Sequence, residues 1–228
     1  MVKYFCPSSF LNLFTEEEDG LIADNYDKQV TLSRELFLNY DQQEMIEKFH
    51  LRADEQYIYI SLLNQPYCIL RDSGVVETET GECREFSVVM TLYDVLCCSA
   101  KAPVLAHQWV SISNIQMVST SPDTGTFTRR YAEYFSGKTE LLMRVCQQIG
   151  GRRPAVTAGA DAAWEFDLLP FLPVQFRFWD GDDEFPAQIK LLWDKNTLDF
   201  LHFETTYYAQ GWLLGVLRQR MEALKGKA

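Results

Sequence analysis

Two apolar runs with a period of two residues flank a short acidic segment, and this feature most narrowly limits how the chain can fold. In residues 174–179 (VQFRFW) and residues 187–193 (AQIKLLW), apolar side chains recur at every second position. A period of two is typical of a strand with one buried face. The intervening residues 180–186 (DGDDEFP), called the acidic loop below, contain a glycine and a proline that favour a turn. The pattern therefore predicts a β-hairpin with a loop longer than a tight turn needs.

The acidic loop carries carboxylates at four of five consecutive positions, residues 180–184. Neighbouring carboxylates repel by roughly 1 kcal/mol at contact distance in water, so some interaction must offset this cost. One hypothesis is a Mg²⁺ or Ca²⁺ site built from Asp180, Asp182 and Glu184, since hard cations prefer carboxylate oxygens. An EF-hand is excluded because Leu191 stands where the bidentate glutamate is required. Solvation or salt bridging of the carboxylates is the alternative.

Composition and charge restrict the function classes. The chain has 228 residues, of which 47% are hydrophobic and 14% aromatic, so it can bury a full core. Its formal net charge of −11 argues against binding to nucleic acid or to an anionic membrane surface. No apolar run reaches the roughly 18 residues of a spanning helix, and the first residues lack a secretory pattern. We therefore expect a cytoplasmic protein whose partner is a small-molecule ligand or another protein.

Cysteine and histidine spacing argues against a structural metal site. The six cysteines form no CxxC pair, and the three histidines at 50, 107 and 202 provide little material for a multi-histidine site. Cys97 and Cys98 lie in an apolar helical context, where thiols behave as small buried hydrophobes. The sequence also contains no GxGxxG, no phosphate-binding GxxxxGK[ST] loop and no GxSxG nucleophile elbow.

The first half of the chain is predicted to form an irregular arm (residues 1–30), helices and one sheet. Helical spacing begins at Thr31. Asp41 and Glu44 form a capping-box pattern that opens a helix to about Phe49, closed by His50. β-rich runs at 57–62, 67–70 and 75–76 predict a three-stranded meander. Apolar spacing of three and four residues over 82–100 predicts an amphipathic helix.

The second half is predicted to contain two more helices besides the hairpin. One runs from about 139 to 149 with Thr139 as its cap, and the last reaches about residue 224 with Thr205 or Thr206 as its cap. Gly211 and Gly215 lie in that last helix, where each costs roughly 1 kcal/mol, so we expect another backbone to approach closely there. Residues 150–167 form the best linker or mobile-loop candidate. The fold class predicted is α+β, with residues 31–228 forming one domain in which two small antiparallel sheets, an N-terminal meander and a C-terminal hairpin, pack with several helices.

The C-terminal half contains, in order, a proline-flanked strand (Leu172-Pro173), the DEFP turn at 183–186, Asp194 and Glu204. This set of motifs resembles a family of bacterial and archaeal proteins that is known only as a domain of unknown function, DUF3786. The segments HQWVSI (107–112) and FTRRYAEYFSGK (127–138) and the lone Asp161 also match, so the resemblance covers roughly residues 30–220. It implies no established activity. Some members look fused to a cysteine-rich iron–sulfur module of corrinoid proteins, which implies a corrinoid or another tetrapyrrole as a possible ligand, but this chain lacks those cysteines.

Three functional hypotheses follow. The leading one is a non-catalytic ligand- or cofactor-binding module whose site forms where the acidic loop, the 104–112 segment and the 150–167 segment meet, with aromatic side chains that stack on a flat ligand. Arg129 and Arg130 are predicted either to pair with the acidic loop, to hold an anionic ligand, or simply to be solvated. The residues predicted to bind the ligand are His107, Trp109, Arg129, Arg130, Asp161, Trp179, Asp182, Asp183, Glu184 and Phe185.

The two alternatives reuse parts of that site. One is a metal-assisted hydrolase or lyase in which Asp182, Asp183 and Glu184 work with His107 as proton carrier. The other is a protein-interaction subunit that docks a partner through exposed Phe185 and Trp179.

Overall fold

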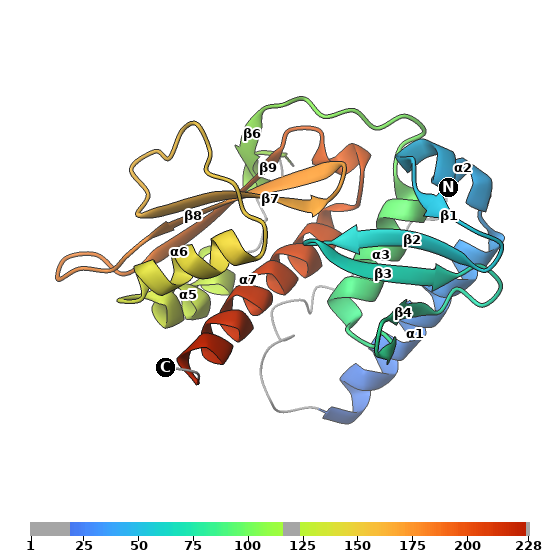
Figure 1. Cartoon of the computed structure of the whole chain (residues 1–228), viewed down its shortest axis with the longest axis horizontal. Helices are drawn as coiled ribbons and strands as arrows, with labels where there is room; N and C mark the ends of the chain where they lie inside the picture. Colours follow the sequence, from blue (N-terminus) through green and yellow to red (C-terminus); the bar gives the residue numbers. More distant parts are fainter. Residues whose placement is uncertain (1–18, 116–123, 227–228) are drawn as a thin grey trace.

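The predicted hairpin lies at the centre of a four-stranded antiparallel sheet in the computed structural model, which describes residues 19–115 and 124–226 (Figure 1). Its strands are β8 (Leu172–Trp179) and β9 (Gln188–Asp194), paired from Val174 opposite Trp193 to Trp179 opposite Gln188. On the predicted inner face, Val174, Phe176, Phe178 and Trp193 are fully buried, and Ile189 near the acidic loop is partly buried. The predicted strand faces are therefore confirmed.

Two further strands complete this sheet, whose order is β6-β9-β8-β7. The short β6 (Trp109–Ser111) pairs with the last three residues of β9. The long β7 (Ala162–Leu169) pairs with β8 along its whole length. The prediction of a linker over residues 150–167 was therefore wrong from residue 162 onward. Glycine and small residues upstream obscured an apolar strand whose side chains are mostly buried.

The N-terminal sheet is a meander of five strands, two more than predicted. Its long members are β2 (Tyr57–Leu62) and β3 (Gln65–Leu70). Every second side chain of β2 is buried. The two strands missed are only two residues long, too short to show a period. In order along the sheet, the other strands are β1 (Arg52–Ala53), β4 (Val76–Thr78) and β5 (Gly81–Glu82).

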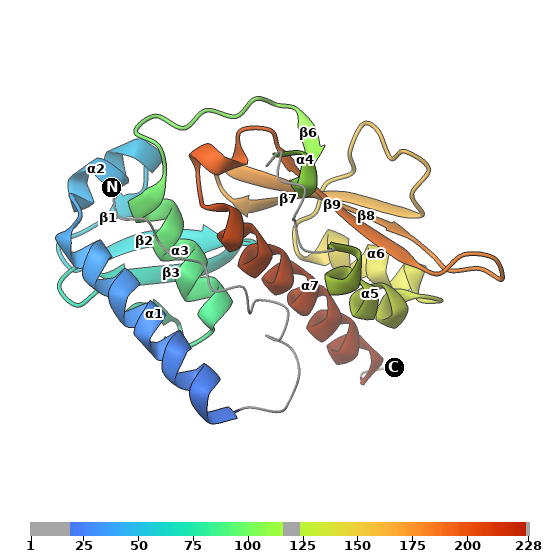
Figure 2. The ribbon, with the colours of Figure 1, turned by 180° about the vertical axis from the view of Figure 1, so that it is seen from behind.

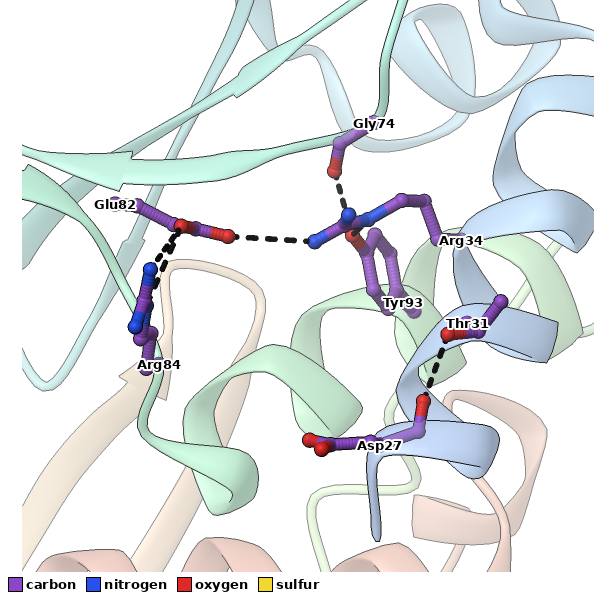
Figure 3. Close-up of polar contacts among 7 residues, drawn as sticks. All are labelled: Asp27, Thr31, Arg34, Gly74, Glu82, Arg84 and Tyr93. Carbon is purple, nitrogen blue, oxygen red and sulfur yellow. Dashed lines mark hydrogen bonds and ion pairs between the residues drawn. The ribbon is translucent and has the colours of Figure 1, made fainter. Parts of the chain in front are cut away.

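Helices α1 (Asp19–Asn39) and α3 (Phe86–Cys98) pack beside this sheet, as Figure 2 shows from behind. The prediction of an irregular arm through residue 30 was wrong for residues 19–30, and residues 1–18 lie outside the described part. Contact with α3 stabilises α1 where its own periodicity is weak. The close-up in Figure 3 shows the polar link: Arg34 donates to the Tyr93 hydroxyl (3.4 Å) and approaches Glu82 (3.6 Å). The Tyr93 hydroxyl in turn donates to the Gly74 carbonyl (2.5 Å).

Helix α2 (Gln42–Phe49) begins as the capping pattern predicted. The Asp41 carboxylate accepts from the backbone N–H groups of Gln43 and Glu44, and His50 ends the helix in the left-handed conformation with φ 51°. The cap satisfies two of the N–H groups that a helix start leaves without partners.

Replacing Asp41 by alanine is expected to lower the free energy of unfolding by about 1 kcal/mol, because those two N–H groups lose their acceptor. Urea unfolding monitored by circular dichroism measures the change. Asp72→Ala serves as a control, since Asp72 is also an exposed aspartate but lies outside any helix. An equal loss in both variants would show that the cap contributes nothing.

The C-terminal helix α7 (Phe203–Lys225) runs between the two sheets and contacts α3, α5 and α6 (Figures 1 and 2). The other helices of this half are α4 (Ile112–Ile115), α5 (Thr124–Phe135) and α6 (Thr139–Gln148), and a 3-10 turn spans Thr197–Asp199. One continuous cluster of buried apolar residues joins both sheets through α7. Among the described helices, none is long and apolar enough to cross a membrane.

Two details of α7 differ from the prediction. Its N-cap residue is His202, and Thr205 and Thr206 lie inside the first turns. A side chain added at Gly211 would meet the Phe127 ring at 3.3 Å, whereas one added at Gly215 would meet no described atom within 4 Å. The expected close approach of another backbone was therefore wrong; at Gly211 the space is taken by an aromatic side chain.

Candidate functional site: a groove beside the acidic loop

Backbone amides hold the tip of the acidic loop in shape. Oδ1 of Asp182 accepts from the N–H groups of Glu184 (2.8 Å) and Phe185 (2.7 Å), and the Asp182 N–H donates to the Phe185 carbonyl (2.9 Å). These hydrogen bonds lower the pKa of Asp182, with the one from Phe185 contributing most. Part of the repulsion expected among the loop carboxylates is thus offset locally.

Asp180 ties the start of the loop to the turn between α5 and α6. Its carboxylate accepts from the N–H of Gly137 (3.0 Å to Oδ1 and 3.1 Å to Oδ2) and from the hydroxyls of Ser136 (2.8 Å) and Thr139 (2.8 Å). The Gly181 N–H also donates to it (2.8 Å). Desolvation opposes ionisation of Asp180, but the hydrogen bonds, led by the one from Gly137, outweigh it and lower the pKa. Thr139, predicted to cap α6, therefore serves Asp180 instead.

Asp161 brings the end of the 150–161 segment to the same place. Asp161 directly precedes β7, and its Oδ2 accepts a hydrogen bond from the Asp180 N–H at 2.8 Å. Two carboxylates far apart in the sequence thus flank the start of the acidic loop. The juxtaposition of Asp161 with this loop was part of the predicted site.

An open groove of about 730 Å³ lies beside these residues. Trp179, Phe185 and Pro186 provide its aromatic and apolar wall, with Phe185 62% exposed. Three carboxylates and one ammonium, that of Lys190, line it. Asp182 accepts the loop N–H groups through Oδ1, and Asp161 accepts the Asp180 N–H through Oδ2. Within the described structure, the other oxygen of each of these two aspartates is available to a ligand.

The edge of β9 forms another part of the groove. The strand β6 ends at Ser111 opposite Leu192, so residues 188–191 pair with β8 on one side and have no described strand on the other. Residues 188–191 also line the groove. An unpaired strand edge presents backbone N–H and C=O groups to whatever binds there.

Gln210 of α7 lines the groove and carries a buried hydrogen-bond donor that has no described partner. Its side chain is 3% exposed, and its Nε2 has no hydrogen-bond partner within the described structure. Leaving such a donor unpaired costs roughly 1–3 kcal/mol, which a bound acceptor would recover. No local pattern in the sequence marks Gln210, because its position in the groove depends on how α7 packs against the sheet.

The structure brings together only part of the predicted site. Asp161, Trp179, Asp182 and Phe185 line the groove with Asp180. Asp183 and Glu184 are exposed on the loop and do not line the groove.

The two predicted arginines lie elsewhere. Arg129 and Arg130 are exposed on α5, and within the described structure neither forms an ion pair with the acidic loop. Arg130 instead donates to the Tyr131 hydroxyl (3.3 Å) and lies over its ring. Of the three alternatives for these arginines, pairing with the acidic loop is therefore not observed, and their exposure agrees with a solvated position on the helix.

His107 and Trp109 are at the far end of the sheet. Trp109 pairs with Asp194, whereas the acidic loop joins β9 at Gln188. Six residues of strand separate these ends by about 20 Å. The predicted composite of His107 with the loop was therefore wrong, and so was His107 as proton carrier for Asp182, Asp183 and Glu184.

The cation site predicted in the acidic loop also finds no support. Within the described residues, Asp180, Asp182 and Glu184 do not place their oxygens within 4.8 Å of one another. Asp180 and Asp182 are instead committed to protein donors. Hydrogen bonds from N–H and O–H groups to Asp180 and Asp182 offset part of the loop repulsion, and Asp183 and Glu184 are exposed to solvent.

The fold and the groove together define an α+β protein with two antiparallel sheets and an open site at the edge of the C-terminal sheet. The chain belongs to the family described as domain of unknown function (DUF3786), whose model matches residues 41–215. The family resemblance seen in the sequence is thereby confirmed. No curated protein and no solved structure matches this chain.

Proposed function

We propose that the protein is a non-catalytic ligand-binding module whose site is the groove beside the acidic loop. The observation that carries the proposal is the buried Nε2 of Gln210, which has no hydrogen-bond partner among the described residues, in a groove with aromatic walls. Binding sites combine a concave surface with a few convergent polar groups in this way. Two of the three carboxylates that line the groove, Asp180 and Asp182, accept hydrogen bonds from the protein that lower their pKa values, which favours ligand binding over acid–base catalysis.

The lining also defines the chemical class of the ligand. Trp179 and Phe185 offer faces for a planar ring, and the free oxygens of Asp161 and Asp182 accept hydrogen bonds. Three carboxylates against one ammonium, on a chain of net charge −11, repel an anion. The ligand is therefore a planar nitrogen heterocycle that carries N–H donors and no negative charge.

A tetrapyrrole fits this groove only in part. The described lining has no imidazole, thiolate or thioether that could bind the central metal of a corrinoid or haem. The propionates of haem would also face Asp161 and Asp182. An amide-bearing corrinoid avoids that repulsion, but the groove would hold it by its periphery alone.

Matched pairs of ligands test the proposal. We expect at least one of adenosine, guanosine, riboflavin and hydroxocobalamin to bind in a saturation-transfer NMR screen. Among the first three, the phosphorylated counterparts AMP, GMP and FMN should bind at least about tenfold more weakly, because the carboxylates repel phosphate. Preference for the phosphates, or no binding by any of the four ligands, would contradict the proposal.

Variants locate the site. Trp179→Ala removes the stacking face and Gln210→Leu removes the buried donor, and each is expected to weaken binding by about tenfold. Asp183→Asn changes a carboxylate of the same loop that does not line the groove, and should leave binding unchanged. Equal weakening in all three variants would indicate a general charge or folding effect instead of this site.

A protein partner is the second candidate, favoured by the exposure of Phe185 and the unpaired edge of β9. An extended peptide can add to such an edge as a further strand. Size-exclusion chromatography that recovers a stable complex from the native host, lost in Phe185→Ala but kept in Asp183→Asn, would favour this function over small-molecule binding.

A further inference from the structure

A second group of ligating side chains lies where α3 meets the start of α7, outside the groove. Asp94 and Cys98 are one helical turn apart on α3, and His202 directly precedes α7. One ligand atom from each of the three lies within 4.8 Å of the other two. Within residues 19–115 and 124–226, no other trio of histidine, cysteine or acidic side chains converges in this way.

Asp94 orients the histidine. Its Oδ2 accepts from the His202 backbone N–H at 2.7 Å, and its Oδ1 lies 2.5 Å from His202 Nδ1. A pair of this kind could serve only to hold the two helices together. That role requires Asp94 and His202 but gives no reason for the half-buried thiol of Cys98 to lie at the same point.

From this geometry we propose that Asp94, Cys98 and His202 bind a divalent transition-metal ion of the zinc class. A thiolate, an imidazole and a carboxylate are the ligands that Zn²⁺ accepts, whereas Mg²⁺ and Ca²⁺ take oxygen ligands. The thiolate and the carboxylate balance the charge of the ion. The negative end of the α3 dipole, at Cys98, favours a cation further.

The site opens to solvent on its histidine side. Asp94 is 9% exposed, whereas the side chain of His202 is 54% exposed. Three protein ligands then leave one position for water or an external ligand, as in zinc sites that bind substrates. The nearby ammonium of Lys48 does not fill the site, since it bonds to the hydroxyls of Tyr40 (3.2 Å) and Ser99 (3.2 Å).

Metal binding needs only a small rearrangement. Tetrahedral zinc at about 2.0–2.1 Å from nitrogen and oxygen places those atoms roughly 3.3 Å apart. Nδ1 of His202 and Oδ1 of Asp94 must therefore separate by about 0.8 Å from their 2.5 Å contact. Rotation of the exposed imidazole provides this movement without displacing either helix.

Cobalt titration of the metal-depleted, full-length protein tests the proposal. Co²⁺ stands in for Zn²⁺ and gives a thiolate-to-cobalt absorption band that reports a bound cysteine. We expect one Co²⁺ per chain with this band, its loss in Cys98→Ser, and at least about tenfold weaker binding in His202→Ala. The matched controls Cys68→Ser and His107→Ala change residues outside the cluster and should bind as the wild type does.

A second measurement separates site loss from misfolding. Zinc is expected to raise the melting temperature of the wild type and of both controls, but not that of Cys98→Ser or His202→Ala. Circular dichroism of the metal-free variants verifies that they fold. The proposal is overturned if the wild type shows no thiolate band, or if the band survives in folded Cys98→Ser.

Discussion

Replacing Trp193 by alanine is expected to lower the free energy of unfolding by about 3–5 kcal/mol. The indole is fully buried on the inner face of β9, opposite Val174. The indole belongs to a closely packed core, whose side chains can refill the space only in part. The loss therefore combines the transfer of a large apolar group with the cavity that remains.

Urea unfolding followed by far-ultraviolet circular dichroism measures this loss. Trp179→Ala is the matched control, since Trp179 lies on the outer face of the same hairpin and is only half-buried. Its loss should be below about 1.5 kcal/mol, because solvent replaces part of its contacts. If the two variants lose equal stability, the burial of the two hairpin faces has been assigned wrongly.

Replacing Asp180 by alanine is expected to cost about 2–3 kcal/mol, the second largest effect. Four donors on two segments lose their ionised acceptor at once: the hydroxyls of Ser136 and Thr139 and the N–H groups of Gly137 and Gly181. The α5–α6 turn also loses its attachment to the hairpin. Asp183→Ala removes a neighbouring exposed carboxylate as control, and its effect should stay within about 0.5 kcal/mol.

The contribution of Asp180 to the free energy of unfolding also depends on pH, and it decreases as the pH falls. Because the folded-state pKa is lowered from 3.8, the contribution is fully present above the unfolded-state pKa and is lost as pH falls through the folded value. The stability difference between wild type and Asp180→Asn should thus shrink below about pH 4. Unfolding curves at pH 7 and at pH 3 measure it. A difference that stayed constant would contradict the assignment of an ionised Asp180 as the acceptor.

Local sequence patterns correctly predicted those strands and helix ends that are specified by a few neighbouring residues. The hairpin faces followed from a period of two, and the start of α2 followed from Asp41, whose side chain caps residues two and three positions ahead. Strands of two or three residues, such as β1 and β6, give no such period. Their existence depends on a partner strand, which local sequence does not identify.

In the candidate site, too, the residues held together by local sequence were predicted and those brought together by strand pairing were not. Trp179, Asp182 and Phe185 were predicted because the turn itself holds them together, and Asp161 through the family resemblance. His107 was misplaced because the register of β6 on β9 puts Trp109 opposite Asp194, at the end of β9 away from the loop. A strand register brings together residues that are tens of positions apart in the chain. Local spacing in the sequence does not indicate which residues will pair.

Short-range periodicity and recognisable motifs were enough to predict the α+β class, the buried face of the hairpin, the capped start of α2 and membership of the family. Long-range packing, in contrast, places Gln210 in the groove and brings His202 to Asp94 and Cys98. Both results depend on where α7 lies against the sheet and against α3. That position follows from burial of a shared core, a property of the whole chain that no single segment contains.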